Sequence, residues 1–180
     1  MAGFSRDMIA IFAALALWLG SIAPLTAAAV TPAESSVSVT FVNPEQFTEN
    51  RLYGRQDRFN RVDYLARLKA YLIKQGQAVL KPGQTLHVDI TDIRLAGAYE
   101  PWRGPQWSYV RIMRDIYSPR IDLNFRLVDQ DGNVLRGGKR VLRNIDYLHS
   151  SVSLPATEGA PLYYDKALLR RWLMRGPDKL

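Results

Sequence analysis

A hairpin signal in the second half of the chain does most to constrain the fold. Residues 120–128 alternate between apolar and polar side chains, and the apolar set is Ile121, Leu123, Phe125 and Leu127. The polar run at 129–133, which contains Gly132, is typical of a tight turn, and a return strand follows from Val134 to Tyr147. Because side chains in a strand alternate between its two faces, this pattern predicts an antiparallel hairpin with one buried face. Gly137 and Gly138 indicate a bulge or a close approach in the return strand.

Two further strands are predicted upstream. Val37, Val39 and Phe41 alternate with polar residues, and the strand ends at Asn43 and Pro44. After a turn at Pro82 and Gly83, a second alternating run begins, and its apolar members are Leu86, Val88 and Ile90, followed out of phase by Ile93 and Leu95. One inserted residue exchanges the faces of a strand, so the change of phase predicts a β-bulge near Thr91 or Asp92.

Two amphipathic helices are predicted. The first has Asn60 as its N-cap, Asp63 three positions later, and an apolar stripe made of Val62, Leu65, Leu68 and Leu72. It is expected to run to about Gln75 and to end at Gly76, the residue best suited to a left-handed C-terminal cap. The second carries Leu168, Leu169, Trp172 and Leu173 on one face and ends at Gly176 and Pro177.

The order of these elements predicts the fold class. A strand, a helix, a strand, a long loop, a hairpin and a final helix favour an α+β fold, with a mixed or antiparallel sheet of about four to five strands. Both helices are expected to pack on one face of that sheet. Residues 45–58, 96–119 and 150–161 are expected to be connections.

The first 29 residues have the pattern of a cleavable signal peptide. Arg6 supplies a short positive region, residues 8–19 form an apolar run, and Ala27, Ala28 and Ala29 offer small residues at a cleavage site. The alternative is a retained membrane anchor, but a membrane-spanning helix needs roughly 20 apolar residues. We therefore expect export to the periplasm or beyond, with no stable membrane span after cleavage and one domain over residues 30–180.

Composition limits the partners of that domain. The net charge is +7, and behind a signal peptide a basic balance points to anionic envelope polymers, lipid headgroups or acidic proteins, and away from nucleic acid. The alternative is that the charge serves solubility alone. The chain has no cysteine, which excludes both a disulfide and a lipid-modified cysteine at the cleavage site.

Several blocks of the chain carry a family resemblance. They are VSVTFVNPEQFTENR, VDITDIRLAG, VRIMRDIYSPRIDLNFRLVDQDGNVL, LRNIDYL and YYDKALLRRWL, in that order. In these blocks the chain resembles the bacterial family catalogued as domain of unknown function 3016, from about Val37 to Leu173. The resemblance implies an exported protein from a family of unknown function and assigns no catalytic residue.

The loop at 96–119 is the most function-like part of the sequence. Long loops on a rigid scaffold often carry binding residues, and this one combines aromatic rings with guanidinium groups, which suit sugar rings, carboxylates or a protein hot spot. The candidate binding residues are Trp102, Arg103, Trp107, Tyr109, Arg111 and Arg114. The alternative is that the tryptophans fold back as a lid over the core. A second group of cations, on the return strand, is interpreted as protection of a solvated edge strand, and it comprises Arg136, Lys139, Arg140 and Arg143.

Other chemistry has little support in the sequence. His87 and Asp89 share a strand face, but a closed metal site needs more donors, and the only other histidine, His149, lies in a different segment. No serine lies in a nucleophile motif, and no glycine-rich phosphate loop is present. The carboxylate pairs are better explained by strand and turn chemistry, and they are Asp89 with Asp92 and Asp129 with Asp131. We expect no cofactor, no metal and no catalytic residue.

Three classes of function remain open. The favoured one is a non-enzymatic envelope binding or accessory module for a protein or an anionic glycan, which predicts exposed Trp102 and Trp107. The second is a periplasmic enzyme of unknown type, with hydrolysis as one candidate reaction, which predicts carboxylates from distant segments that converge with raised pKa values. The third is a self-associating structural domain, which predicts a large apolar patch or a free sheet edge.

Overall fold

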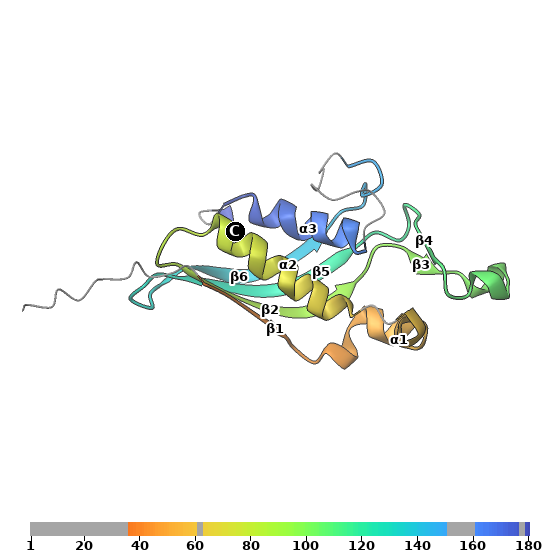
Figure 1. The fold of residues 1–180 in the computed structure, drawn as a ribbon. Coiled ribbons are helices and arrows are strands. Elements are labelled where there is room, and N and C mark those ends of the chain that lie inside the picture. The colour runs from red at the N-terminus through yellow and green to blue at the C-terminus, as the bar shows by residue number, and fades with distance from the viewer. Residues whose placement is uncertain (1–35, 61–62, 151–160, 177–178) are drawn as a thin grey trace, which may run out of the picture. The chain divides into compact units, whose positions relative to one another are not determined.

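The domain is built on a four-stranded sheet covered by helices on one face (Figure 1). The computed structural model describes residues 36–60, 63–150, 161–176 and 179–180. The signal peptide expected at residues 1–29 and most of the loop expected at 150–161 lie outside these residues. The strands follow the spatial order β1-β2-β5-β6, with the bounds β1 (Ser36–Phe41), β2 (Thr85–Arg94), β5 (Arg120–Val128) and β6 (Val134–Arg143).

The sheet is mixed. Strands β1 and β2 run parallel, while β2 pairs with β5 and β5 with β6 in antiparallel fashion. The predicted bulge in β2 is confirmed, because the register with β5 shifts between Ile90 and Asp92. The predicted hairpin is also confirmed, and its turn is held by Asp129, whose carboxylate accepts hydrogen bonds from the backbone of Asp131 and Asn133.

One detail of the hairpin differs from expectation. The return strand ends at Arg143 and does not reach Tyr147. The irregularity in its pairing lies beside the turn, between Leu127 and Val128, and not at the two glycines. The predicted close approach is confirmed at Gly137, since a Cβ there would lie 3.1 Å from the carbonyl oxygen of Phe125.

Three α-helices are described: α1 (Thr48–Asn60), α2 (Tyr64–Val79) and α3 (Tyr163–Leu173). Helix α1 occupies the segment that was predicted to be a polar connection, so that prediction was wrong. Asn60 is its last residue and does not cap the next helix; Asp63 does, accepting a hydrogen bond from the backbone N–H of Ala66 at 2.9 Å. None of the described helices is both long and apolar enough to cross a membrane.

Helix α2 also continues past the predicted end. Gly76 is an interior residue of the helix and packs against β1, where an added Cβ would lie 2.8 Å from a methyl group of Val37. The glycine is therefore explained by close approach of helix and strand rather than by a C-terminal cap.

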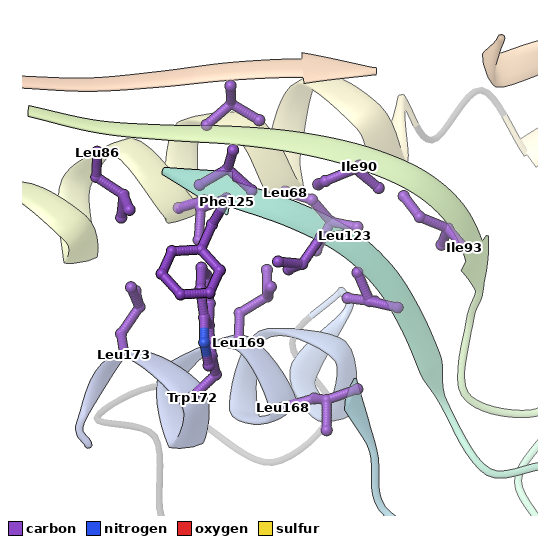
Figure 2. Close-up of a cluster of buried hydrophobic side chains, with 14 of the residues drawn as sticks. Leu68, Leu86, Ile90, Ile93, Leu123, Phe125, Leu168, Leu169, Trp172 and Leu173 are labelled. Atoms are coloured by element: carbon purple, nitrogen blue, oxygen red, sulfur yellow. The ribbon is translucent and has the colours of Figure 1, made fainter. Parts of the chain in front are cut away.

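The hydrophobic core lies between the sheet and helices α2 and α3 (Figure 2). Trp172 of α3 packs edge-on against Phe125 of β5, with the ring centroids 5.7 Å apart. Leu68 from α2 and Leu169 from α3 are fully buried in the same cluster. These contacts confirm the placement of both helices on one face of the sheet and their predicted apolar faces, apart from Val62, which lies outside the described residues.

The segment between β2 and β5 is more ordered than a loop. It contains a two-stranded antiparallel sheet, β3 (Ala98–Tyr99) with β4 (Arg111–Ile112), and two short 3₁₀ turns, η2 (Pro101–Arg103) and η3 (Pro105–Trp107). A third 3₁₀ turn, η1 (Pro44–Gln46), precedes α1. In Figure 1 the β3–β4 hairpin lies beyond one end of the four-stranded sheet, and the two turns lie at its outer end.

Candidate functional site

The outer end of the β3–β4 hairpin presents three aromatic side chains to solvent. Each 3₁₀ turn begins with a proline, which fixes φ, and Gly104 joins them at φ 120°. Trp102 is 72% exposed, Trp107 39% and Tyr109 52%. We call these three side chains the aromatic tip. Val110, which follows Tyr109 directly, is a further exposed apolar residue beside the tip.

Two of the predicted arginines flank the aromatic tip and share one buried carboxylate. The guanidinium carbon of Arg103 lies 5.7 Å from the centroid of the Trp107 ring. Arg103 Nε is 3.5 Å from one carboxylate oxygen of Glu100, and Arg114 Nε is 3.3 Å from the other. Tyr117 donates its hydroxyl hydrogen to Glu100 at 3.0 Å. Glu100 is fully buried although both arginine side chains are substantially exposed, so the negative charge lies inside and the positive charges face solvent.

Arg111 points the other way, into the base of the hairpin. Its guanidinium donates to Glu49 at 2.6 and 2.7 Å, and to the carbonyl oxygens of Ala96 at 2.7 Å and Gly97 at 3.3 Å. It also lies over the rings of Tyr53 and Tyr99, at 5.3 and 5.1 Å from their centroids. Burial opposes its positive charge, but the Glu49 carboxylate outweighs that effect and raises the pKa of Arg111. Arg111 thus joins α1 to the hairpin.

Two buried carboxylates hold the backbone where β2 leads into the hairpin. Glu49 accepts the N–H of Leu95 at 2.9 Å, and Asp165, in the first turn of α3, accepts the N–H of Ala96 at 3.0 Å. Burial raises the pKa of Asp165 to about 6, although the Ala96 N–H and the charge of Arg111 oppose the shift. The start of the hairpin is therefore fixed by residues from two helices that are distant in the sequence.

The other side of the hairpin is fixed by backbone contacts. Gly97 adopts φ 78°, and a Cβ at this position would lie 2.7 Å from the sulfur of Met113 and 2.9 Å from the carbonyl oxygen of Ile112. The Gly97 N–H donates to the carbonyl oxygen of Tyr117 at 3.0 Å. Tyr147 donates its hydroxyl hydrogen to the carbonyl oxygen of Arg114 at 2.8 Å. These contacts hold the base of the hairpin, and the aromatic tip lies at its free end.

The predicted site residues therefore separate into two groups. Five of them lie at or beside the aromatic tip, while Arg111, whose side chain is only 17% exposed, supports it from inside. Glu49, Glu100 and Asp165 were missed. Glu49 lies in a segment that was predicted to be a polar connection, and an acidic residue in the first turn of a helix, such as Asp165, is usually explained by the helix dipole. No local signal distinguishes these carboxylates from solvated ones.

Other candidate chemistry stays scattered. Within the described ranges, no group of three or more histidine, aspartate or glutamate side chains could hold a metal ion. His87 lies in the sheet opposite Arg126, and Asp89 opposite Asn124. His149 is 3.9 Å from Asp115, and both side chains are exposed.

Comparison with known proteins places the chain in a family. No curated protein matches it. A family model described as "Protein of unknown function (DUF3016)" matches residues 35–175, which include all the strands and helices described above. On that match, the chain belongs to the DUF3016 family of proteins of unknown function.

Proposed function

We propose that this protein is a non-enzymatic binding or accessory module of the bacterial cell envelope, and that the aromatic tip holds its ligand. The exposure of Trp102 and Trp107 at the end of a hairpin whose base is held by buried hydrogen bonds is the observation that carries the proposal. The proposal includes export through a cleavable signal peptide at residues 1–29 and a periplasmic or secreted location.

The composition of the aromatic tip supports a binding role. Tryptophan, tyrosine and arginine are the residues most enriched in interface hot spots, where truncation of one of them costs about 2 kcal/mol or more. Here Trp102, Trp107 and Tyr109 are exposed beside Arg103 and Arg114. Leaving such large apolar surfaces in water is unfavourable, and a bound ligand would remove them from it.

The support beneath the aromatic tip favours tight binding. A binding loop that is already ordered loses less conformational entropy when its ligand arrives. The bonds of Arg111 to Glu49 and to the backbone of Ala96 and Gly97 provide that order. Their role is to position the tip rather than to touch the ligand.

A protein is the favoured ligand, and an anionic glycan is the second candidate. The exposed apolar side chain of Val110, next to Tyr109 in the sequence, adds to the three aromatic side chains of the tip, as expected for contact with a protein surface. The stack of Arg103 on Trp107 favours the glycan, because an aromatic face can pack on a sugar ring while the guanidinium binds a carboxylate.

An enzyme is the weaker alternative. Buried carboxylates from distant segments are present, and the pKa of Asp165 is raised to about 6, as a general acid would require. However, Glu49 and Asp165 both accept backbone N–H groups, which gives them a structural task. The aromatic tip, rather than these carboxylates, faces solvent.

The proposal is tested by removing the tip while keeping the fold. Immobilised wild type, a Trp102→Ala/Trp107→Ala variant and a Met174→Ala control are each incubated with solubilised envelope proteins and with purified anionic envelope glycans. Met174 is a suitable control because it is 64% exposed and lies just after α3. We expect a ligand that wild type and the control retain and the double variant loses, with equal thermal stability of all three. Equal retention by all three would refute the proposal.

A further inference from the structure

The outer edge of β6 is a second exposed feature, separate from the aromatic tip. This ten-residue strand pairs with β5 on one side only, and residues 134–139 are exposed on both faces. Across the described part of the chain, no strand pairs with its other side and no loop backbone hydrogen-bonds to the β6 backbone, although the Arg140 side chain donates to the carbonyl oxygen of Leu180 at 2.7 Å. One backbone oxygen of the strand, that of Lys139, accepts from the Arg140 side chain at 2.9 Å.

Such an edge is a template for another strand. Unpaired N–H and C=O groups along a regular edge can hydrogen-bond an extended segment, which is how many domains bind peptides. Strand β1 is the other edge of the sheet, but it is shorter and packs closely against α2 through Gly76. Strand β6 is therefore the more available edge.

The charge on β6 selects among possible occupants. The strand carries four cations and no acidic residue: Arg136, Lys139, Arg140 and Arg143. The register with β5 sets Arg136 and Arg140 opposite the buried Leu127 and Leu123, and Lys139 opposite Asn124, so cations lie on both faces of the strand. An added strand would meet positive charge on either side.

This charge distribution disfavours a second copy of the chain. Antiparallel pairing of two β6 strands about Gly138 would place Arg136 against Arg140, and pairing about Lys139 would place the two Lys139 side chains against each other. Like charges directly opposite each other destabilise a strand pair, and no acidic residue of β6 relieves them in any register. The cations that prevent self-pairing would attract an acidic strand.

We infer that the outer edge of β6 is a docking site for an extended, acidic segment of a partner protein, which adds to the sheet as a fifth strand. This inference is independent of the aromatic tip and of any ligand bound there.

The test uses a fluorescein-labelled peptide of alternating glutamate and valine on the purified protein. A control peptide has proline in place of each valine, so that it keeps the charge but loses those backbone N–H donors. Binding is followed by fluorescence anisotropy, and hydrogen exchange of the Val134–Arg143 amides locates the site. We expect the alternating peptide to bind at least tenfold more tightly than the proline peptide and to slow exchange along β6.

Matched variants separate the edge from general charge attraction. Lys139→Glu/Arg143→Glu is expected to weaken binding at least tenfold, whereas Lys69→Glu/Lys74→Glu on α2 makes the same change in net charge and is expected to bind like wild type. A Trp102→Ala/Trp107→Ala variant is also expected to bind normally. Equal affinity for the two peptides, equal loss in both charge variants, protection outside β6, or no binding would each overturn the inference.

Discussion

Replacement of Arg111 by methionine should be the most damaging single change at the candidate site. Methionine keeps a long unbranched side chain but removes the charge and every hydrogen bond. Glu49, which is fully buried, would keep the Leu95 N–H but lose its ion pair with Arg111. Breaking a buried ion pair by removing one partner costs about 3–5 kcal/mol, because an uncompensated charge stays in the interior. The carbonyl oxygens of Ala96 and Gly97 also lose their donor.

The assay is urea unfolding at pH 7, followed by far-ultraviolet circular dichroism. We expect Arg111→Met to lower the free energy of unfolding by about 3–5 kcal/mol. Arg67→Met, the same replacement at an exposed position of α2, should change it by less than about 0.5 kcal/mol.

A double-mutant cycle isolates the ion pair. Adding Glu49→Gln to Arg111→Met removes the uncompensated charge, so the double variant should be more stable than the sum of the two single losses predicts, by about 1–3 kcal/mol. A loss below about 1 kcal/mol for Arg111→Met, or strict additivity in the cycle, would refute the account of Arg111 as the support of the hairpin.

Three further predictions concern single residues. The pKa of Asp165 is raised from 3.8 to about 6, so the folded state binds the Asp165 proton more readily than the unfolded state does, and wild type loses about 3 kcal/mol of stability as pH rises from below 4 to above 6. Urea unfolding at pH 4.5 and at pH 7.5 should therefore show that Asp165→Asn gains stability relative to wild type at the higher pH. A stability difference that does not change with pH would contradict this. Gly97→Ala should lower the melting temperature, because position 97 has a positive φ and the added methyl group would lie 2.9 Å from the carbonyl oxygen of Ile112. An unchanged melting temperature would show that the hairpin backbone shifts to accommodate the methyl group. Trp102→Ala should leave stability within about 0.5 kcal/mol of wild type, since its side chain is mostly in water, and a larger loss in urea unfolding would mean that the ring supports the fold.

Much of the sheet could be predicted from the sequence because strand periodicity is local. The alternation around Phe125 and the turn at Asp129 specify the hairpin, and the change of phase after Ile90 located the bulge, since inserting one residue exchanges the faces. The apolar stripes around Leu68 and Leu169 likewise identified the two helices that cover the sheet.

Features that depend on tertiary contacts could not be predicted. Gly76 resembles a helix cap in the sequence, yet α2 continues through it, because the glycine allows close approach to Val37. Helix α1 was missed because its sequence is mainly polar and no apolar stripe was recognised in it. Arg111 and Glu49 are 62 positions apart, and no local pattern indicates that they meet.

The central claim, that the aromatic tip holds a ligand, is tested most directly by photocrosslinking in cells. A photoreactive amino acid replaces Trp107 in one strain and Met174 in another, and adducts are identified by mass spectrometry. The account predicts a discrete protein or glycan adduct from position 107 that is absent from position 174 and is lost when Trp102→Ala is added. Folded and exported protein that gives no adduct at position 107, or the same adducts at both positions, would contradict it.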